Sequence, residues 1–225
     1  MTLVAWSGLT VAAYLLSKRL YARWRRWWLM PLALTPALLL AAVTVLHVSY
    51  ATYIGATGWL VALLGPATVA FAVPIYAHRD LVRRQWPVLA IAMIVCSVTA
   101  LATSYGLASL VGLDDVLRRS LLPRSISTPF AMAVSHDLGG IPDLTAVFVV
   151  LTGIIGAIVG ETMLARLPLR SSLARGALFG VGAHGAGTAK AQELGATEGA
   201  VAGLVMVLVG LLNVLVAPLV ALVLG

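Results

Sequence analysis

The chain has 225 residues, of which 61% are hydrophobic and only 10% are charged. A soluble domain is typically about 25% charged and about 45–50% apolar, so this composition excludes an ordinary soluble enzyme and a disordered protein. Fifteen basic and eight acidic residues give a net charge of +7. The basic residues lie in short clusters between apolar runs, a pattern typical of membrane topology rather than of a nucleic-acid-binding face. We predict an all-α, multi-pass protein of the cell (inner) membrane that binds no nucleic acid.

Six apolar segments approach the ~20 residues that a helix needs to cross a bilayer. They are 2–17, 30–50, 58–77, 87–111, 143–165 and 198–224. The first segment precedes a basic cluster and has no basic flank of its own, so we interpret it as a retained first helix rather than a cleaved signal peptide. We expect one integral membrane domain over 1–225 with about six to eight transmembrane segments.

Two stretches, 118–140 and 173–195, do not fit a simple span. Both are rich in Gly, Ser, Thr, Pro and charge, yet both lie between strongly apolar segments. If the basic clusters at 79–84 and 166–175 are both cytoplasmic, the number of crossings between them is even, and the two strong spans in that interval already supply it. We therefore expect 118–140 to be a broken or re-entrant helical hairpin, and 173–195 to be a second one that enters from the opposite side.

The sequence also contains internal repeats. Residues 25–80 align with 83–137, and a hairpin-plus-span unit over 118–165 is echoed over 173–224. Repeats with interrupted helices are typical of secondary transporters, in which the interruptions mark the binding site near the membrane midplane. The alternative interpretation is that Gly and Pro merely kink ordinary packed helices.

The first interruption has two prolines that bracket three hydroxyls and a cation, Leu122-Pro123-Arg124-Ser125-Ile126-Ser127-Thr128-Pro129. Proline lacks an N–H and disfavours helix at the preceding residue, so the backbone is expected to turn. A helix that begins here with Thr128 as its N-cap makes an anion site with Arg124 and the hydroxyls. In the alternative, Arg124 reaches the membrane interface and the hydroxyls only cap a helix. Thr68 is the repeat counterpart of Ser125.

The second interruption contains four glycines within eight residues, in Gly180-Val181-Gly182-Ala183-His184-Gly185-Ala186-Gly187-Thr188-Ala189-Lys190. Glycine weakens a helix and permits close approach of backbones. His184 and Thr188 share a helical face, and Lys190 is spaced to pair with Glu193. Ionisable residues at membrane depth are functional candidates by default. The alternative is a packing contact in which His184 is a satisfied hydrogen bonder.

Other polar positions have structural interpretations. Glu161 is expected to pair with Arg166 at the end of a span, Asn213 to hydrogen-bond between helices, and Gly156 and Gly160 to pack against a neighbouring helix. The sequence shows no nucleophile–base pair and no metal-ligand spacing. We therefore expect no enzymatic activity and no cofactor.

A set of ordered motifs from residue 60 onward resembles the LrgB/CidB membrane protein family, which includes the plant plastid glycolate/glycerate translocators. These motifs are Leu64-Gly65-Pro66-Ala67-Thr68-Val69-Ala70, the proline-bracketed segment, Gly139-Gly140-Ile141-Pro142, Thr152-Gly153, Ala174-Arg175-Gly176, His184-Gly185-Ala186-Gly187-Thr188-Ala189 and Glu198-Gly199-Ala200. The family usually shows lysine where this chain has Arg124, which keeps the charge but changes its hydration and geometry.

The resemblance implies two different functions. Bacterial members are named antiholin-like or holin-like regulators of murein hydrolase activity and cell lysis, and often act with a small LrgA/CidA-type membrane partner. The plant relatives carry glycolate and glycerate. Broken polar helices suit an anion carrier, whereas a holin needs only lipid-facing helices that oligomerise. We therefore predict a transporter for small monocarboxylates such as glycolate, lactate or pyruvate, with the antiholin-like regulator as the alternative.

The substrate is expected near the membrane midplane, where the two broken stretches face each other. We also expect contact with membrane lipid and a homo-oligomer, a dimer. The predicted substrate-binding residues are Arg124, Ser125, Ser127, Thr128, Thr68, His184, Gly185, Gly187, Thr188 and Lys190.

Overall fold

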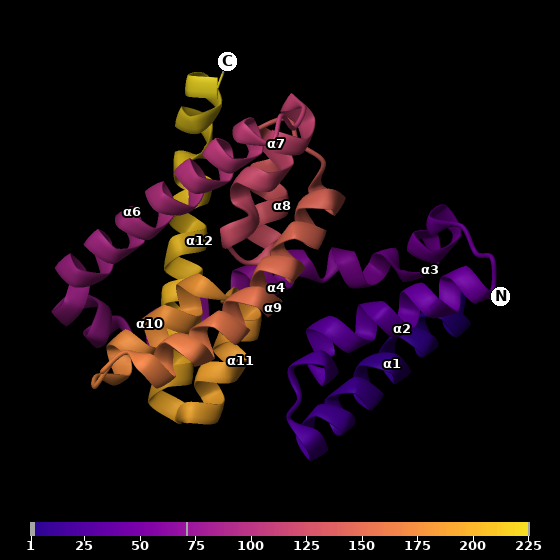
Figure 1. Ribbon diagram of the computed structural model, residues 1–225, viewed down its shortest axis with the longest axis horizontal. Helices are drawn as coiled ribbons and strands as arrows, with labels where there is room; N and C mark the ends of the chain where they lie inside the picture. Colours follow the sequence, from indigo (N-terminus) through magenta and orange to yellow (C-terminus); the bar gives the residue numbers. More distant parts are fainter. Residues whose placement is uncertain (1–2, 71, 225) are drawn as a thin grey trace. The chain divides into compact units, whose positions relative to one another are not determined.

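The computed structural model describes residues 3–70 and 72–224, and in this part of the chain every regular element is a helix (Figure 1). The chain divides into two compact units, Met1–Ala67 and Thr68–Gly225. This confirms the predicted all-α class for the described residues.

The first unit is a small helical cluster built around α1. Its helices are α1 (Leu3–Trp24), the 3-10 helix η1 (Trp27–Leu29), α2 (Pro31–Val45) and α3 (Tyr50–Ala62), followed by the start of α4 (Leu64–Ala70). Trp6 is buried and its ring meets the edge of Tyr53, with the ring centroids 5.6 Å apart. Ser7 Oγ donates to the Ala56 carbonyl at 2.9 Å. These contacts hold α3 against α1.

The second unit is organised around the long C-terminal helix. Its elements are α5 (Ala72–Ala77), α6 (Arg79–Leu110), α7 (Asp115–Leu121), the 3-10 helix η2 (Leu122–Ser125), α8 (Thr128–Asp137), α9 (Pro142–Arg166), α10 (Ser172–Gly182), α11 (His184–Leu194) and α12 (Ala196–Leu224). Helix α12, yellow in Figure 1, packs against α10, α11, α8 and α6. Its buried residues include Val201, Leu204 and Val205, which make it the core of this unit.

Three helices of the described residues are long and apolar enough to cross a membrane: Arg79–Leu110, Pro142–Arg166 and Ala196–Leu222. They correspond to the predicted spans 87–111, 143–165 and 198–224. The expected total of six to eight segments stays a prediction.

The first half of the chain differs from the expected spans. The predicted span 58–77 is interrupted at Leu63, between α3 and α4, and the helix in 30–50 ends at Val45. His47 has a φ of 50°, which ends a helix, and the Ser49 side chain then caps α3 by accepting from Thr52 N at 3.2 Å. Apolar composition therefore hid local turns that interrupt the helices.

The two interrupted stretches, 118–140 and 173–195, are broken helices, as predicted. In 118–140 the chain changes from α7 to η2 at Leu122, and Ile126 is extended before α8 begins. In 173–195 helices α10 and α11 meet at Ala183. Each stretch is followed by a candidate membrane span, α9 or α12. The re-entry of these hairpins into the bilayer stays a prediction.

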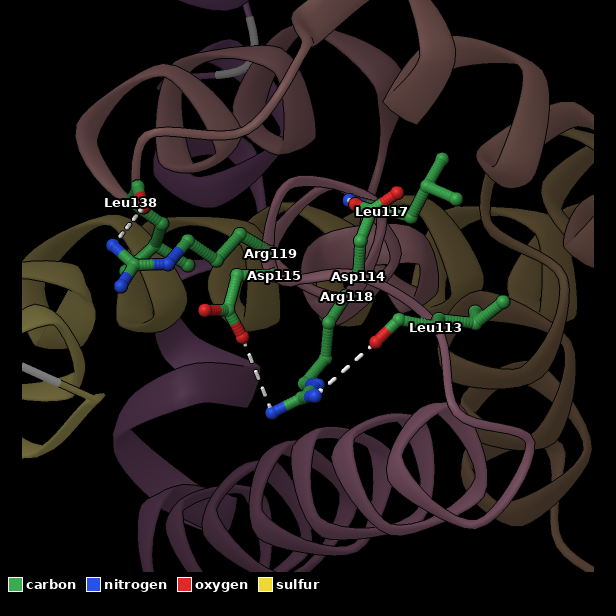
Figure 2. Close-up of polar contacts among 7 residues, drawn as sticks. All are labelled: Leu113, Asp114, Asp115, Leu117, Arg118, Arg119 and Leu138. Carbon is green, nitrogen blue, oxygen red and sulfur yellow. Dashed lines mark hydrogen bonds and ion pairs between the residues drawn. The ribbon is translucent and has the colours of Figure 1, made fainter.

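Local polar contacts fix the α7 end of the first hairpin (Figure 2). Arg118 Nη1 lies 3.4 Å from Asp115 Oδ1, and its Nη2 donates to the Leu113 carbonyl at 3.1 Å. Arg119 Nη1 donates to the Leu138 carbonyl beyond α8, at 3.0 Å. Arg119 therefore ties the two ends of the hairpin together, whereas the contacts of Arg118 are local to the start of α7.

A buried hydroxyl cluster closes the same hairpin onto α9. Thr145 Oγ1 lies 2.7 Å from Ser135 Oγ and 2.8 Å from the Ser120 carbonyl, and Ser120 Oγ accepts from Ile141 N at 2.8 Å. A Cβ added at Gly140 would lie within 3.0 Å of Ser120 and Ser135 atoms, so only glycine fits there. These hydrogen bonds fix the two arms of the hairpin, and therefore the η2 turn between them, against the start of α9.

The proposed duplication of 25–80 in 83–137 is not visible as matching secondary structure. Pro66 lies within α4, whereas Pro123 lies in η2 with φ and ψ of −84° and 15°. Helices α2 and α3 are separate, whereas α6 is continuous over 32 residues. The duplication stays a prediction.

Candidate functional site

A cavity of about 480 Å³ lies in the second unit, bordered by α6, η2, α9 and α10. Its polar lining consists of Arg124 and Ser125 from η2, Thr152 from α9, and Thr99 and Thr103 from α6. The other lining side chains are apolar apart from that of Cys96. Apolar walls with a few convergent polar groups are typical of small-molecule sites.

The turn at η2 delivers Arg124 to this cavity. Leu122, Pro123 and Ile126 are buried, and Leu122 and Ile126 belong to the main hydrophobic cluster. These neighbours anchor the turn on both sides, while Arg124 and Ser125 between them are only half-buried. The proline interrupts the helix, because it cannot donate a backbone hydrogen bond, and the side chains on the turn face the cavity.

Arg124 is the cation of the cavity. Its Nη1 lies 3.5 Å from Thr152 Oγ1, and Thr152 is near the middle of the 25-residue helix α9. Among the described residues Arg124 makes no ion pair. A guanidinium in apolar surroundings without a carboxylate partner is costly, and an anion that binds there lowers that cost.

His184 brings the second broken stretch to the same place. It is the first residue of α11, is only 2% exposed, and has a φ of 45°. Its ring lies beside the backbone of Ser125 and within electrostatic range of Arg124, yet neither ring nitrogen has a hydrogen-bond partner of good geometry. A left-handed non-glycine residue costs about 1–3 kcal/mol and such residues cluster at functional sites.

The first turn of α8 differs from the expectation in its capping residue. Ser127, not Thr128, is the N-cap, because Pro129 is tolerated in the first helical turn, where a missing N–H costs little. The Ser127 side chain makes no capping bond, is 6% exposed, and its Oγ has no partner. Thr128 is half-buried. Neither Ser127 nor Thr128 is among the residues that line the Arg124 cavity.

The sequence model of a family described as LrgB-like matches residues 10–223. The chain belongs to the LrgB-like family. The match confirms the resemblance and extends it toward the N-terminus, where only apolar helices had been recognised.

Relatives of this LrgB-like chain carry two kinds of name. It is 38% identical over 210 residues to the uncharacterized protein YwbG of Bacillus subtilis (strain 168), covering 93% of each chain. It is 32% identical over 188 residues to the antiholin-like protein LrgB of the same organism, covering 84% of this chain and 81% of that one. The antiholin-like protein LrgB of Bacillus mycoides (strain KBAB4) is 32% identical over 156 residues, 69% of this chain and 68% of that one. No solved structure matches the chain.

Several predicted site residues of this LrgB-like chain have other roles. Thr188 Oγ1 donates to the His184 carbonyl at 2.9 Å, within its own helix. Gly187 is a packing position, because a Cβ there would overlap the carbonyl oxygen of Phe179. Gly185 is exposed. The side chain of Thr68 lies outside the described part of the structure.

Lys190 lies in a different pocket from Arg124. Its Nζ is 2.5 Å from Glu161 Oε1 and 3.4 Å from Glu193 Oε2. The expected pairing with Glu193 is confirmed. The expected pair between Glu161 and Arg166 is wrong, because the buried ammonium of Lys190 reaches Glu161 while Arg166 is exposed to solvent.

The cavity also contains residues that the sequence reasoning missed. Thr152 belongs to the Thr152-Gly153 motif, which could have identified it. The sequence signal for Thr99 and Thr103 is only their spacing of four residues, which puts them on one face of α6. Asn213 was correctly predicted to bond between helices, and its Nδ2 donates to Ser97 Oγ at 2.9 Å. This bond ties α12 to α6 beside the cavity.

Proposed function

We propose that this LrgB-like protein is a transporter for small monocarboxylates of the glycolate, lactate and pyruvate class. The observation that carries the proposal is the Arg124 guanidinium, which faces a cavity beside Thr152 without an ion pair among the described residues. A charge at membrane depth is energetically costly, and such residues typically mark a ligand site or an ion pathway.

The site chemistry fits a carboxylate. Arginine binds a carboxylate with two parallel charge-assisted hydrogen bonds, and hydroxyls of Ser125 and Thr152 can donate to the remaining lone pairs. The cavity volume, about 480 Å³, is within the range of small-molecule sites, roughly 300–1,000 Å³. It leaves room for a two- or three-carbon acid together with water.

The second candidate function is an antiholin-like regulator of murein hydrolase activity and cell lysis. It is favoured by the names of the relatives in Bacillus subtilis and Bacillus mycoides. This function requires an effect on membrane permeability or on a partner protein, and it does not require a selective anion site.

Flux measurements in proteoliposomes separate the two. A transporter takes up one or more two- or three-carbon acids with saturation and with competition among them. Selectivity that is lost in Arg124→Ala, but kept in the exposed-arginine control Arg84→Ala, supports the proposal. Leakage of neutral solutes and acids alike favours the antiholin-like function instead.

A further inference from the structure

The connection between α1 and α2 carries the largest group of positive charges in the chain. Five cationic residues lie within positions 18–26, and we call them the basic turn: Lys18, Arg19, Arg23, Arg25 and Arg26. All five are exposed. The sequence has no acidic residue before Asp80, so the first unit offers these cations no carboxylate. Their mutual repulsion therefore has no compensation within that unit.

The backbone of the basic turn is folded rather than a loose connection. Arg25 N donates to the Tyr21 carbonyl at 2.8 Å, and Leu29 N donates to the Arg26 carbonyl at 2.9 Å. Met30, which follows, is buried. Helices α1 and α2 both pack against η1, so the three elements form a hairpin (Figure 1). The cations are therefore presented on a fixed turn.

Arg25 has an unfavourable backbone conformation. It directly follows the last residue of α1 and has a φ of 42°, in the left-handed region. Glycine is the usual residue at such a position, because a Cβ is strained there. Residues held in strained conformations cluster at ligand sites. Arg25 is exposed, so packing of its side chain does not explain the strain, whereas its charge is a property that glycine lacks.

Three tryptophans accompany the cations. Trp24, Trp27 and Trp28 are about half exposed, at 55%, 51% and 47%. The Arg23 guanidinium carbon lies 5.9 Å from the Trp24 ring centroid, and that of Arg26 lies 5.4 Å from the Trp28 centroid. Tryptophan is enriched at the level of lipid headgroups. A guanidinium that stacks on a ring keeps its in-plane N–H groups, which can donate to an anion.

Cationic and apolar surface occur together at this end of α1. The exposed residues just before the basic turn include Leu15 and Leu16. A free phosphate ion could pair with the guanidinium groups, but a lipid also covers the tryptophan rings and leucines with its acyl chains. Clusters of about four to eight cations beside an apolar helix attract anionic lipids. We propose that the basic turn binds the phosphate headgroup of an anionic phospholipid at the membrane surface.

Lipid titration of the full chain in neutral detergent, read by native mass spectrometry, tests the site. Phosphatidylglycerol should bind more tightly than phosphatidylcholine. Combining Arg25→Gly with Arg26→Ala should weaken phosphatidylglycerol binding roughly 25-fold, about fivefold for each charge removed, and leave phosphatidylcholine binding unchanged. The matched control combines Arg83→Ala with Arg84→Ala. This exposed arginine pair also precedes an exposed tryptophan, Trp86, but it shares its helix with Asp80. The control should keep the wild-type affinity.

Thermal unfolding of Arg25→Gly separates lipid binding from a structural role of Arg25. Glycine suits the left-handed backbone, so the unfolding temperature without lipid should not fall. Phosphatidylglycerol should raise the unfolding temperature of the wild type, and that of Arg25→Gly by less. A variant that is less stable without lipid, yet gains as much as the wild type from phosphatidylglycerol, would show that Arg25 is structural and overturn its role in lipid binding.

Three other results would overturn the proposal. Equal affinity for phosphatidylglycerol and phosphatidylcholine would show that the headgroup charge is not recognised. Equal losses in the two double variants would indicate general attraction to a positive protein rather than a site. Inorganic phosphate that stabilises the protein as well as phosphatidylglycerol does would exclude a lipid as the specific partner. None of these measurements uses a transported solute, so the outcome is independent of the proposed transport function.

Discussion

At the scale of single residues, Arg124 is the position on which the proposed function depends. It is held by a turn whose neighbours are buried, and its head group is near Thr152 in the middle of α9. The polar side chains around it differ in whether their hydrogen-bonding groups are already used within the protein. Thr188 donates its hydroxyl hydrogen within α11, whereas Ser127 Oγ has no hydrogen-bond partner and the ring nitrogens of His184 have none of good geometry.

We expect Arg124→Ala to weaken monocarboxylate binding by about 10–100-fold, since charge-assisted hydrogen bonds contribute roughly 1.5–3 kcal/mol and 1.4 kcal/mol is tenfold. Arg124→Lys should recover part of the affinity, because the charge remains but the two-pronged geometry does not. The measurement is concentration-dependent uptake in proteoliposomes, with Arg84→Ala as the control. Wild-type uptake by folded Arg124→Ala would refute the assignment of Arg124.

Ser127→Ala separates binding from stability. The hydroxyl has no partner to lose, so the thermal unfolding temperature should not fall. If the ligand uses this hydroxyl, affinity should drop about fivefold, since a neutral hydrogen bond contributes about 1 kcal/mol. Unfolding of the detergent-solubilised variant is compared with its uptake curve. A lower unfolding temperature with unchanged affinity would show that Ser127 is structural.

At the scale of elements, close helix contacts through glycine decide where the second hairpin lies. Gly156 of α9 faces the Gly182 carbonyl of α10, and Gly187 of α11 faces the Phe179 carbonyl of α10. Both contacts are with backbone oxygens, which cannot move away as a flexible side chain can. Small residues at such contacts let helices approach closely in membranes.

Gly187→Ala and Gly185→Ala form a matched pair within one turn of α11. The added methyl at 187 would overlap the Phe179 carbonyl oxygen, so we expect destabilisation of about 1–3 kcal/mol. At Gly185 a Cβ meets nothing within 4 Å, and Ala favours the helix by roughly 0.5–1 kcal/mol. In detergent, the unfolding temperature should therefore fall in Gly187→Ala and rise in Gly185→Ala. Equal shifts would contradict the α10–α11 packing.

At the scale of the whole molecule, the division into two compact units places the candidate site in the second one. The Arg124 cavity, the ion pair between Lys190 and Glu161 and the three candidate membrane spans all lie in Thr68–Gly225. Long-range side-chain bonds join its helices, and Asn213 on α12 reaches Ser97 on α6 across a separation of 116 residues.

We expect Asn213→Ala and Ser97→Ala each to lower the free energy of unfolding by about 0.5–1.5 kcal/mol, because each breaks the hydrogen bond between α12 and α6. In Ser97→Ala the Asn213 amide keeps its bond to the Val209 carbonyl. The double variant should be less destabilised than the sum, since the second substitution removes a bond that is already broken. Equilibrium unfolding in detergent measures this coupling. Additive effects would show that the bond contributes no stability.

The sequence by itself determined the properties that depend on local chemistry. Apolar content indicated a membrane protein, Pro123 predicted the break after α7, and the glycines around His184 predicted the break between α10 and α11. The two breaks follow from the residues themselves, because proline lacks a backbone N–H and glycine weakens a helix, so no distant partner is needed. The ordered motifs identified the family for the same reason, since they are read along the chain.

Only the tertiary structure decided which of the predicted residues meet. Arg124 and His184 converge because buried neighbours anchor η2 and glycine contacts let α9, α10 and α11 approach closely. Lys190 is also a charged residue of the second broken stretch, but its ammonium contacts Glu161 and it does not line the Arg124 cavity. Composition and spacing along one chain do not encode which faces of separate helices touch, because that choice depends on the shape and volume of many side chains at once.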